Sequence, residues 1–585
     1  MGHCFDDHFL PAYIAEALRK QGRWHVVEFP RPDGLVIRHL HVDRDVLRTI
    51  ARELRSRRQV LLGDGALWNR ESLLRRLAGL QLLAREIVLP GAPLRQEMLE
   101  ILPHLSGISE KMVAILFDSL EDLLVRTGWA AVARSLPPNQ AARQWIPTAE
   151  GYARYYPGPL GLSWPGLLAL SRRLASRPVP LWPVLGTPAL VCNIASGNVP
   201  GMALMQALLA VSIGAASLGK NASAEPYSGP RLLQELAALE AQRGVFPLSD
   251  LIALVTFSGT EQSLLEELIH QSDHLQATGG QESKSVITGM VSRLRFRSSR
   301  DLRRQVSRHW HKISFDIISR EYLTSSWIQT VAANVAMDNA MFNTQGCLSA
   351  QQVLVEGDQA NALYFCVHLV EQMQDLLERL PKGRGAGEGL REMYMAYENK
   401  TKVRIITRLS DLAHWPIFVA YEDEPEQLPA FSTLNRSILV RRVDSLETAL
   451  PRLLGEGKWR DLLQSCGVAI PQERLLPIAE MLGRAGVKRI VAAGDIWNLR
   501  LGRDSWDGYL PPTDLLVPQL GYWATVAFEE ADKELQRVHA RNETLLGRRL
   551  SFSGLEFPPK QTRIDPHSPG GQQEIMSRLS RRPFP

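Results

Sequence analysis

Apolar residues recur every three or four positions through most of the first 150 residues of this chain. This spacing places them along one face of an α-helix, with arginines and acidic residues on the other faces. Prolines and glycines interrupt the pattern at 90–93 and 137–138. The pattern therefore predicts a mainly helical N-terminal region over residues 1–150. The helical segments are VLRTIARELRSRR (46–58), LLRRLAGLQLLAREI (73–87) and MVAILFDSLEDLLVRTGWAAVARSL (112–136).

From residue 181 onward, short apolar runs alternate with helical segments, which is typical of an α/β architecture. PALVCNIA (188–195) predicts a buried strand, GNVPG (197–201) a tight loop and MALMQALLAVSIG (202–214) a helix. AASLGKNAS (215–223) predicts the next strand and its exit. The chain after residue 181 is therefore expected to form a parallel sheet with covering helices.

A turn of small residues lies between a strand and a helix in LIALVTFSGTEQSLLEELI (251–269). A helix N-terminus presents backbone N–H groups and the positive end of the helix dipole, so such a turn can bind a phosphate. Ordinary helix caps use the same small residues, and the turn lacks the GxGxxG pattern. The turn alone therefore does not establish a nucleotide site.

A cysteine follows one of the later helical segments. SSWIQTVAANVAMDNAMF (325–342) has apolar residues at helical spacing, and the chain then continues with small and polar residues. We predict that Cys347 is a nucleophile, because the amides and hydroxyls around it could favour a thiolate or hold an oxyanion. This stretch alone also fits a structural cysteine beside a turn, because lone buried cysteines are common. The polar and small neighbours are Asn343, Thr344, Gln345, Gly346 and Ser349.

Composition places this 585-residue chain among ordinary globular proteins of two or three domains, with 45% hydrophobic and 22% charged residues. The five cysteines are odd in number and form no CxxC pair, so we expect neither a disulfide framework nor a zinc site. His3, Cys4, Asp7 and His8 crowd the N-terminus without a ligand spacing, so we expect no metal there. The N-terminus also lacks a signal-peptide pattern, and we expect a cytoplasmic protein.

Residues 185–219 carry no charge and are long enough to cross a membrane. Polar residues and a proline interrupt them, so we predict a buried strand, loop and helix and no integral membrane span. The net charge of +5 is too small to indicate nucleic-acid binding. The segment 293–312 has eight basic residues against Asp301. We interpret it as a solvated face, with a contact for phosphates or for a partner protein as the alternative.

Several blocks between about residues 180 and 525 resemble the aldehyde dehydrogenase superfamily. They resemble its acyl-CoA reductase branch, the LuxC-type fatty-acyl reductases, more closely. The order and spacing of all the blocks are much harder to obtain by chance than any one of them. The blocks are NIASGNVPG, SLGKNAS, TFSGTEQ, GGQES, FNTQGCLSAQ and the late series CGVAI, GRAGVKRIVAAGD and GRDSWDG.

The resemblance implies an α/β protein with the aldehyde-dehydrogenase-like fold, which has two Rossmann-like α/β/α domains. One domain would bind a nicotinamide cofactor, the other would carry Cys347, and the two would enclose a cleft. We expect the mainly helical N-terminal region as an addition, and a C-terminal helix followed by a disordered basic tail. The expected boundaries are 1–150 for the helical region, 151–325 for the cofactor domain, 326–525 for the catalytic domain and 526–585 for the C-terminal part.

The same resemblance implies roles for individual residues. Asn198 matches an asparagine that stabilises the oxyanion together with the backbone N–H of the nucleophile, here Cys347. Lys220 matches a lysine that binds the adenosine ribose. Three positions later, hydrolytic NAD enzymes often have a glutamate, whereas this chain has Ser223, which tolerates a 2′-phosphate. We therefore expect NADPH, with NADH as the alternative. The turn over the pyrophosphate matches Ser258 and Gly259, with a helix beginning at Thr260.

The hydrolytic members of the superfamily also use a glutamate to activate water against the thioester. Two segments of this chain can occupy that place, Ala277 to Gln281 or Arg308 to Lys312, and neither has a carboxylate there. An acyl thioester on Cys347 would therefore persist until hydride or CoA reached it. Both alignments stay open, and His309 or His311 could serve as an acid or base.

We therefore expect an NADPH-dependent reductase that converts a long-chain fatty acyl-CoA, or another acyl thioester, into the aldehyde through an acyl-enzyme on Cys347. The expected partners are acyl-CoA or an acylated protein, an acyl-transfer partner protein, and further copies of this chain in a homo-oligomer. Two other classes stay open. One is an acyltransferase or acyl-carrier protein that uses Cys347 without hydride transfer, and the other is a hydrolytic aldehyde dehydrogenase.

Overall fold

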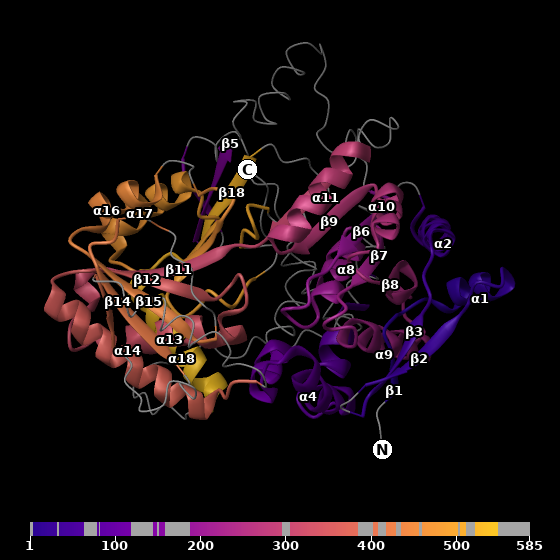
Figure 1. The fold of residues 1–585 in the computed structure, drawn as a ribbon, viewed down its shortest axis with the longest axis horizontal. Helices are drawn as coiled ribbons and strands as arrows, with labels where there is room; N and C mark the ends of the chain where they lie inside the picture. Colours follow the sequence, from indigo (N-terminus) through magenta and orange to yellow (C-terminus); the bar gives the residue numbers. More distant parts are fainter. Residues whose placement is uncertain are drawn as a thin grey trace, which may run out of the picture.

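The structure is a computed structural model that describes most of the chain. The described residues are 4–31, 34–63, 76, 79–80, 82–118, 144–148, 151–157, 188–294, 305–383, 402–406, 417–426, 428, 435–455, 459–500, 504–509 and 521–547. Two sheets, each with helices on both faces, lie side by side, and the N-terminal elements cover the outer side of one of them (Figure 1). The α/β class and the two-part architecture predicted from the sequence are confirmed.

Five parallel strands form the first sheet. In spatial order they are β10 (Gln305–Trp310), β9 (His274–Gly279), β6 (Leu190–Ile194), β7 (Ala216–Asn221) and β8 (Ile252–Thr256). Helices α8 (Met202–Ser212) and α9 (Ser228–Arg243) cover one face, and α10 (Gln262–Gln271) and α11 (Gln281–Leu294) cover the other. The strand order reverses between β6 and β9, so the loops after these two strands flank the crevice where doubly wound sheets bind ligands.

Ten strands form the second sheet. In spatial order they are β13 (Val403–Ile405), β14 (Phe418–Asp423), β15 (Ser437–Val443), β12 (Ala350–Glu356), β11 (Ile313–Ile318), β16 (Leu463–Ala469), β17 (Arg489–Ala492), β18 (Gly521–Val526), β5 (Gly151–Pro157) and β4 (Ile146–Thr148). Helices α13 (Ile328–Ala340), α14 (Gln359–Arg379) and α18 (Ala531–Leu546) pack on one face, and α16 (Leu446–Leu454) and α17 (Gln472–Ala485) pack on the other (Figure 1). The helix α13 and the strand β12 bracket the loop that carries Cys347.

The N-terminal region combines helices with a small sheet that the sequence analysis did not predict. Its strands are β1 (Cys4–Asp6), β3 (Val36–Leu40) and β2 (Val26–Pro30), in that spatial order. Strands of three to five residues are too short to show a clear period, which is why the prediction of a mainly helical region missed them.

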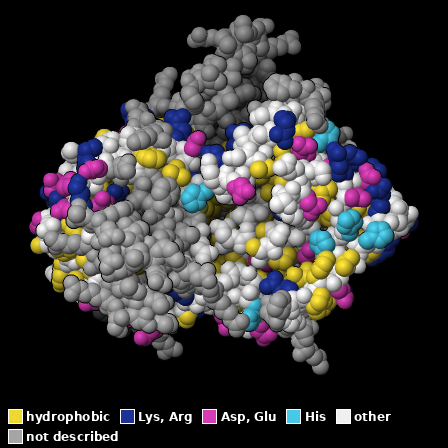
Figure 2. All heavy atoms as spheres, in the orientation of Figure 1, with side chains coloured by type: hydrophobic (Ala, Val, Ile, Leu, Met, Phe, Trp, Pro, Cys, Tyr) yellow, Lys and Arg dark blue, Asp and Glu magenta, His cyan; other side chains and the backbone are white. Residues whose placement is uncertain are grey.

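Helix α2 (Arg44–Leu62) confirms the helix predicted over residues 46–58. Asp43 caps it by accepting the N–H of Val46. Figure 2 shows basic side chains gathered over α2 with acidic ones between them. Arg48 of α2 donates two hydrogen bonds to Glu267 of α10, which fastens the N-terminal region to the first sheet.

The described part of the uncharged stretch 185–219 folds as predicted, into β6, α8 and part of β7. Among the described helices, none combines the length and apolar character needed to cross a bilayer.

The segment expected to form the cofactor domain, 151–325, contributes strands to both sheets, because β5 pairs with β18 and β11 lies inside the second sheet. The roles assigned to the two halves therefore stay predictions. Residues 295–304 of the basic segment and the tail after residue 547 lie outside the described residues.

Candidate active site

The nucleophile predicted from the sequence lies in a strained loop after α13. The helix ends at Ala340, and Phe342, Asn343 and Thr344 then have φ angles of 55°, 50° and 63°. Residues other than glycine rarely adopt this left-handed conformation, and each such residue costs about 1–3 kcal/mol. The surrounding structure must therefore hold the loop that carries Cys347.

Hydrogen bonds from a neighbouring turn and from α13 hold this loop. In the turn before β15, the N–H of Asn435 donates to Asn343 O at 2.8 Å, and the N–H of Arg436 donates to Thr344 Oγ1 at 2.9 Å. Thr344 Oγ1 also donates to Asn339 O at 2.9 Å. The hydroxyl of Thr344 thus connects the loop both to its own helix and to the β15 turn.

The backbone next to the thiol is fixed as well. Ser314 Oγ of β11 donates to the Cys347 carbonyl at 2.6 Å. A side chain on Gly346 would meet the ring of Phe342 at 2.8 Å, so glycine is needed there. The loop is therefore held in one arrangement between α13 and β12.

Two polar neighbours of Cys347 bond the backbone, whereas the buried side-chain amide of Asn343 makes no hydrogen bond to any described residue. The hydroxyls of Thr344 and Ser349 donate to backbone carbonyls. Burial, together with the nearby Asp507 carboxylate, raises the pKa of Cys347 to about 12, while Lys312 lowers it by less. Burial outweighs these neighbours in this state of the protein, and the role of Cys347 as the nucleophile stays a prediction.

The other cysteines have different surroundings. Cys192 in β6, Cys366 in α14 and Cys466 in β16 are fully buried in apolar clusters and are therefore core residues. Cys4 is exposed at the N-terminal end, and Cys347 alone is half-buried. Cys347 is therefore the one cysteine that combines partial access with a constrained polar loop.

Asn198 reaches the nucleophile loop from the other half of the molecule. It lies in the loop after β6, beside the reversal in strand order. Its Nδ2 donates to the carbonyl of Gln345, two residues before Cys347, at 3.2 Å. A side-chain amide has two N–H donors, and the second has no acceptor among the described residues. The structure places Asn198 beside the Cys347 loop, and its role as an oxyanion donor stays a prediction.

The carboxyl ends of β7 and β8 carry the residues predicted to bind a cofactor. Lys220 in β7 is buried, and its Nζ lies 5.4 Å from the ring centroid of Phe257. Burial lowers the pKa of Lys220, and the charge of Glu261 raises it, so the two side chains are close. Gly259 lies in the exposed turn after β8, with nothing within 4 Å of the position that a Cβ would take. A phosphate group could therefore approach this turn.

The turn after β8 differs from the prediction in its helix start. Helix α10 begins at Gln262, two residues later than the expected start at Thr260. The hydroxyls of Ser258 and Thr260 are hydrogen-bonded to each other at 2.7 Å, and the Ser258 N–H donates to Glu261 Oε1 at 3.1 Å. The Glu261 carboxylate thus accepts the hydrogen bond of a backbone N–H that was expected to face a phosphate. Glu261 would have to turn away for a phosphate to bind that amide.

Ser223 lies exposed in the turn after β7. A nearby acidic residue, Glu225, is buried and accepts backbone N–H groups of Gly201, Tyr227 and Ser228. Its carboxylate holds the starts of α8 and α9 and is therefore not available for a ribose. No local sequence pattern indicates this structural role of Glu225, because the role depends on the contact with Gly201.

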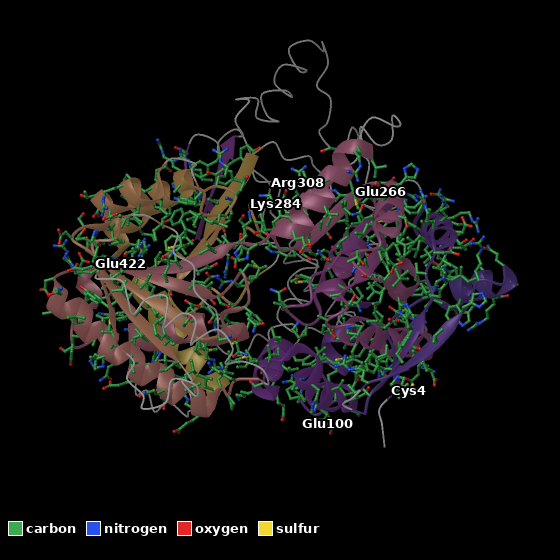
Figure 3. The ribbon with its side chains drawn as sticks, in the orientation of Figure 1. Cys4, Glu100, Glu266, Lys284, Arg308 and Glu422 are labelled. Atoms are coloured by element: carbon green, nitrogen blue, oxygen red, sulfur yellow. The ribbon has the colours of Figure 1, made fainter. Side chains whose placement is uncertain are left out.

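The structure favours one of the two segments considered for the missing glutamate. Arg308 to Lys312 links β10 of the first sheet to β11 of the second, and Figure 3 shows Arg308 at the boundary between the two halves. In the other segment, Ala277 is fully buried in an apolar core. Lys312 also influences the pKa of Cys347, which places the first of these segments beside the nucleophile.

A carboxylate from outside these two segments lies close to the nucleophile. Asp507, in the turn before β18, raises the pKa of Cys347 through its charge. No local pattern could indicate this contact, because the two residues lie far apart along the chain. Asp507 Oδ2 lies within hydrogen-bond distance of His309 Nδ1, at 2.8 Å. Neither of the two segments considered for the hydrolytic glutamate offers a carboxylate at that place.

Comparisons with known proteins agree on family and fold. The family described as acyl-CoA reductase (LuxC) matches residues 185–517. The long-chain acyl-protein thioester reductase of Aliivibrio fischeri is 23% identical to this chain over 329 residues, which are 56% of this chain and 62% of that protein. This chain thus spans about three fifths of the length of that relative.

Two solved structures share the fold. The oxidoreductase from Marinobacter aquaeolei has a TM-score of 0.55 and 15% identity, over 86% of this chain and 95% of that one. The NAD-dependent benzaldehyde dehydrogenase from Corynebacterium glutamicum has a TM-score of 0.53 and 14% identity, over the same shares of the two chains. These likenesses confirm the aldehyde-dehydrogenase-like fold predicted from the sequence.

Proposed function

This chain belongs to the acyl-CoA reductase (LuxC) family, and on that premise we propose that it reduces a long-chain fatty acyl thioester to the aldehyde with NADPH. The acyl group is transferred to Cys347 before it is reduced. Either CoA or a carrier protein delivers it, since the family is named for acyl-CoA and the Aliivibrio fischeri relative for an acyl-protein.

One observation carries the proposal, namely a cysteine loop that both halves of the molecule contact. Ser314 of the second sheet fixes the carbonyl of Cys347, and Asn198 of the first half donates to the carbonyl of Gln345. When the sulfur adds to an acyl carbon, the carbonyl oxygen becomes negative and needs hydrogen-bond donors. The second N–H of Asn198 and the N–H of Cys347 are the donors that we assign to it.

The edge of the first sheet fits a nicotinamide dinucleotide. Lys220 lies at the end of β7, and Ser258, Gly259 and Thr260 form the turn after β8, on the side where doubly wound sheets bind such ligands. The space over Gly259 is open, and Lys220 supplies a cation close to the turn. When bound, the cofactor supplies the hydride. Ser223 stands where an acid would repel a 2′-phosphate, which favours NADPH, with NADH as the alternative.

The residue in the place of the hydrolytic glutamate supports reduction over hydrolysis. Arg308 is exposed there, and an arginine side chain has only donors, so it does not act as a base for water. The acyl thioester on Cys347 therefore waits for hydride. Asp507 is the carboxylate near the thiol, and its Oδ2 is engaged by His309.

The test supplies acyl-CoAs of several chain lengths with NADPH or NADH, and follows the absorbance of the reduced cofactor together with free CoA. We expect cofactor oxidation and CoA release in equal amounts, with long acyl chains preferred and with NADPH used better than NADH. Release of CoA without cofactor oxidation would instead indicate an acyl carrier or a hydrolase. Cys347→Ala should abolish both signals, and Cys366→Ala, a change at a core cysteine, serves as the matched control.

A further inference from the structure

A buried histidine and aspartate join the two halves of the molecule beside the nucleophile. His309 lies in β10 of the first sheet, and Asp507 lies in the turn that precedes β18 of the second. His309 Nδ1 and Asp507 Oδ2 are 2.8 Å apart, and the two side chains are 2% and 1% exposed. Burying such a pair is costly, so its surroundings must compensate for the lost contact with water.

Aromatic rings fix the orientation of this imidazole. Trp506 stacks on His309 with ring centroids 3.8 Å apart and planes inclined by 22°, and Tyr509 meets the ring edge-on at 5.4 Å. Gly508 has a φ of 91°, and a side chain there would meet Tyr522 at 2.7 Å, so the turn needs glycine. The turn that carries Trp506, Asp507 and Tyr509 is therefore rigid, and it holds the ring in one position.

The second nitrogen of the ring has no partner. His309 Nε2 is buried and makes no hydrogen bond to any described residue. Because Asp507 accepts a hydrogen bond from Nδ1, the neutral ring carries its proton on Nδ1, and Nε2 is an acceptor. A buried acceptor without a partner is unfavourable, so Nε2 is ready to take a proton.

The pair and the nucleophile share one region of the molecule. The charge of Asp507 acts on the Cys347 thiol, and so does the charge of Lys312, which follows His309 by three residues. Lys312 Nζ donates to the carbonyl of Asp461 at 2.7 Å. Ser314, five residues after His309, donates to the Cys347 carbonyl at 2.6 Å, so the segment that follows His309 lies beside the nucleophile loop.

Other charged groups in this region do not compete for the free nitrogen. Lys488 packs against the turn, 3.4 Å from the position that a side chain on Gly508 would take, and burial lowers its pKa well below the usual value. It donates to the carbonyls of Gly486 and Arg460. The guanidinium of Arg460 and the carboxylate of Asp461 act on Lys488 through their charges.

The thiol itself needs a base. Burial raises the pKa of Cys347 to about 12, so the thiol keeps its proton at pH 7, whereas the thiolate is the attacking species. The nearby hydroxyls of Thr344 and Ser349 donate to backbone carbonyls, and Lys312 has donors only. His309 is the group in this region with a free acceptor nitrogen.

We propose that His309, oriented by Asp507, takes the proton of the Cys347 thiol as its sulfur attacks the acyl thioester. The bond between the sulfur and the acyl carbon forms, and the bond from that carbon to the departing thiol sulfur breaks. The proton passes from the thiol to His309 Nε2 and then to the departing thiolate, so charge and atoms balance. His309 is the acid–base residue of this step, and Asp507 is a positioning residue. The inference rests on the proposed function, because it concerns the acylation of Cys347.

The experiment compares His309→Gln with His311→Gln in the full-length protein, because His311 is an exposed histidine in the same segment. Each protein is mixed with palmitoyl-CoA without cofactor, and the rate of acylation is followed by release of CoA and by the mass of the intact protein. At pH 7.5, acylation of His309→Gln should be slower than that of the parent by about 10²–10⁴-fold. His311→Gln should keep the rate of the parent.

The dependence of the rate on pH separates proton transfer from a structural role. The parent rate should stay nearly constant from about pH 7.5 to 10, because the thiol then passes its proton to His309 during the attack and does not have to ionise first. The His309→Gln rate should rise about tenfold per pH unit over the same range, because the thiol must then ionise before it attacks. Asp507→Asn should also slow acylation, because it removes the acceptor that keeps the proton on Nδ1.

Several results would overturn the proposal. A parent-like rate for His309→Gln would do so, and so would a slow rate that does not change with pH, which is what a purely structural contact gives. If His309→Gln does not fold, the pH dependence of the parent's acylation rate tests the proposal instead. A parent rate that rises tenfold per pH unit up to pH 10 leaves no role for a base. Failure of the proposed function looks different, since the parent then takes up no acyl mass, or Cys347→Ala still does.

Discussion

Replacing Thr344 with valine removes one hydroxyl from the strained loop and leaves the volume of the side chain almost unchanged. That hydroxyl donates to Asn339 O and accepts the N–H of Arg436, each at 2.9 Å, and Thr344 is fully buried. Thr344→Val leaves both backbone groups without these partners, and each buried unsatisfied group costs about 1–3 kcal/mol. We therefore expect the free energy of unfolding to fall by about 2–6 kcal/mol.

Thr344→Ser is the matched control. Serine keeps the hydroxyl and lacks the second substituent on Cβ, which makes a φ of 63° less strained. It loses one buried methyl group, worth about 0.8 kcal/mol, so we expect its stability to lie within about 1 kcal/mol of the parent.

The assay is urea unfolding followed by intrinsic fluorescence, together with the rate at which iodoacetamide alkylates Cys347. The two variants are compared at the same transition, because a protein with two halves does not have to unfold in a single step. Thr344→Val should unfold at lower urea and should alkylate faster, since its loop is less restrained. A valine variant as stable as the serine variant would refute the idea that these two hydrogen bonds hold the nucleophile loop.

Three further predictions concern other parts of the site and fold. Asn198→Ala should lower the rate of aldehyde formation by about 10²–10³-fold, and a rate near that of the parent would remove Asn198 from the oxyanion site. Ser223→Glu should weaken NADPH by about 1–3 kcal/mol while sparing NADH, and unchanged NADPH affinity by titration would show that Ser223 does not face the 2′-phosphate. Burial raises the pKa of Glu240 to about 7, above that of an unfolded chain, so this residue's contribution to stability should decline as pH rises from about 4.5 to 7. Glu240→Gln should remove that decline from urea titrations, and an unchanged pH dependence would contradict the assignment.

The sequence could predict those features of the site that depend on local pattern. The strand, loop and helix around Asn198 follow from an apolar run, small and polar residues and a second apolar run, and the structure has them at β6 and α8. The position of Cys347 in a loop after a buried helix also follows from the break in apolar spacing at Asn343.

The remaining features depend on contacts between distant parts of the chain. The left-handed conformation of Thr344 is held by Arg436, and the pair of His309 and Asp507 joins two different sheets. Neither contact leaves a pattern in nearby residues. The effect of burial on the pKa of Cys347 also depends on distant contacts, because neighbours along the sequence do not show which groups pack around the thiol. The strands β2 and β3 have five residues each, which is too short for the alternation of apolar and polar residues to predict them.

The mass of the intact protein tests the central claim most directly. Acyl-CoA without cofactor should add one acyl mass to the parent and none to Cys347→Ala. This acyl-enzyme should decay slowly, because neither segment considered for the hydrolytic glutamate has a carboxylate there to activate water. Adding NADPH should then remove the acyl mass and release an equal amount of aldehyde. An acyl-enzyme that hydrolyses within seconds to the free acid, or one that survives NADPH unchanged, would contradict the account of this protein as an acyl thioester reductase.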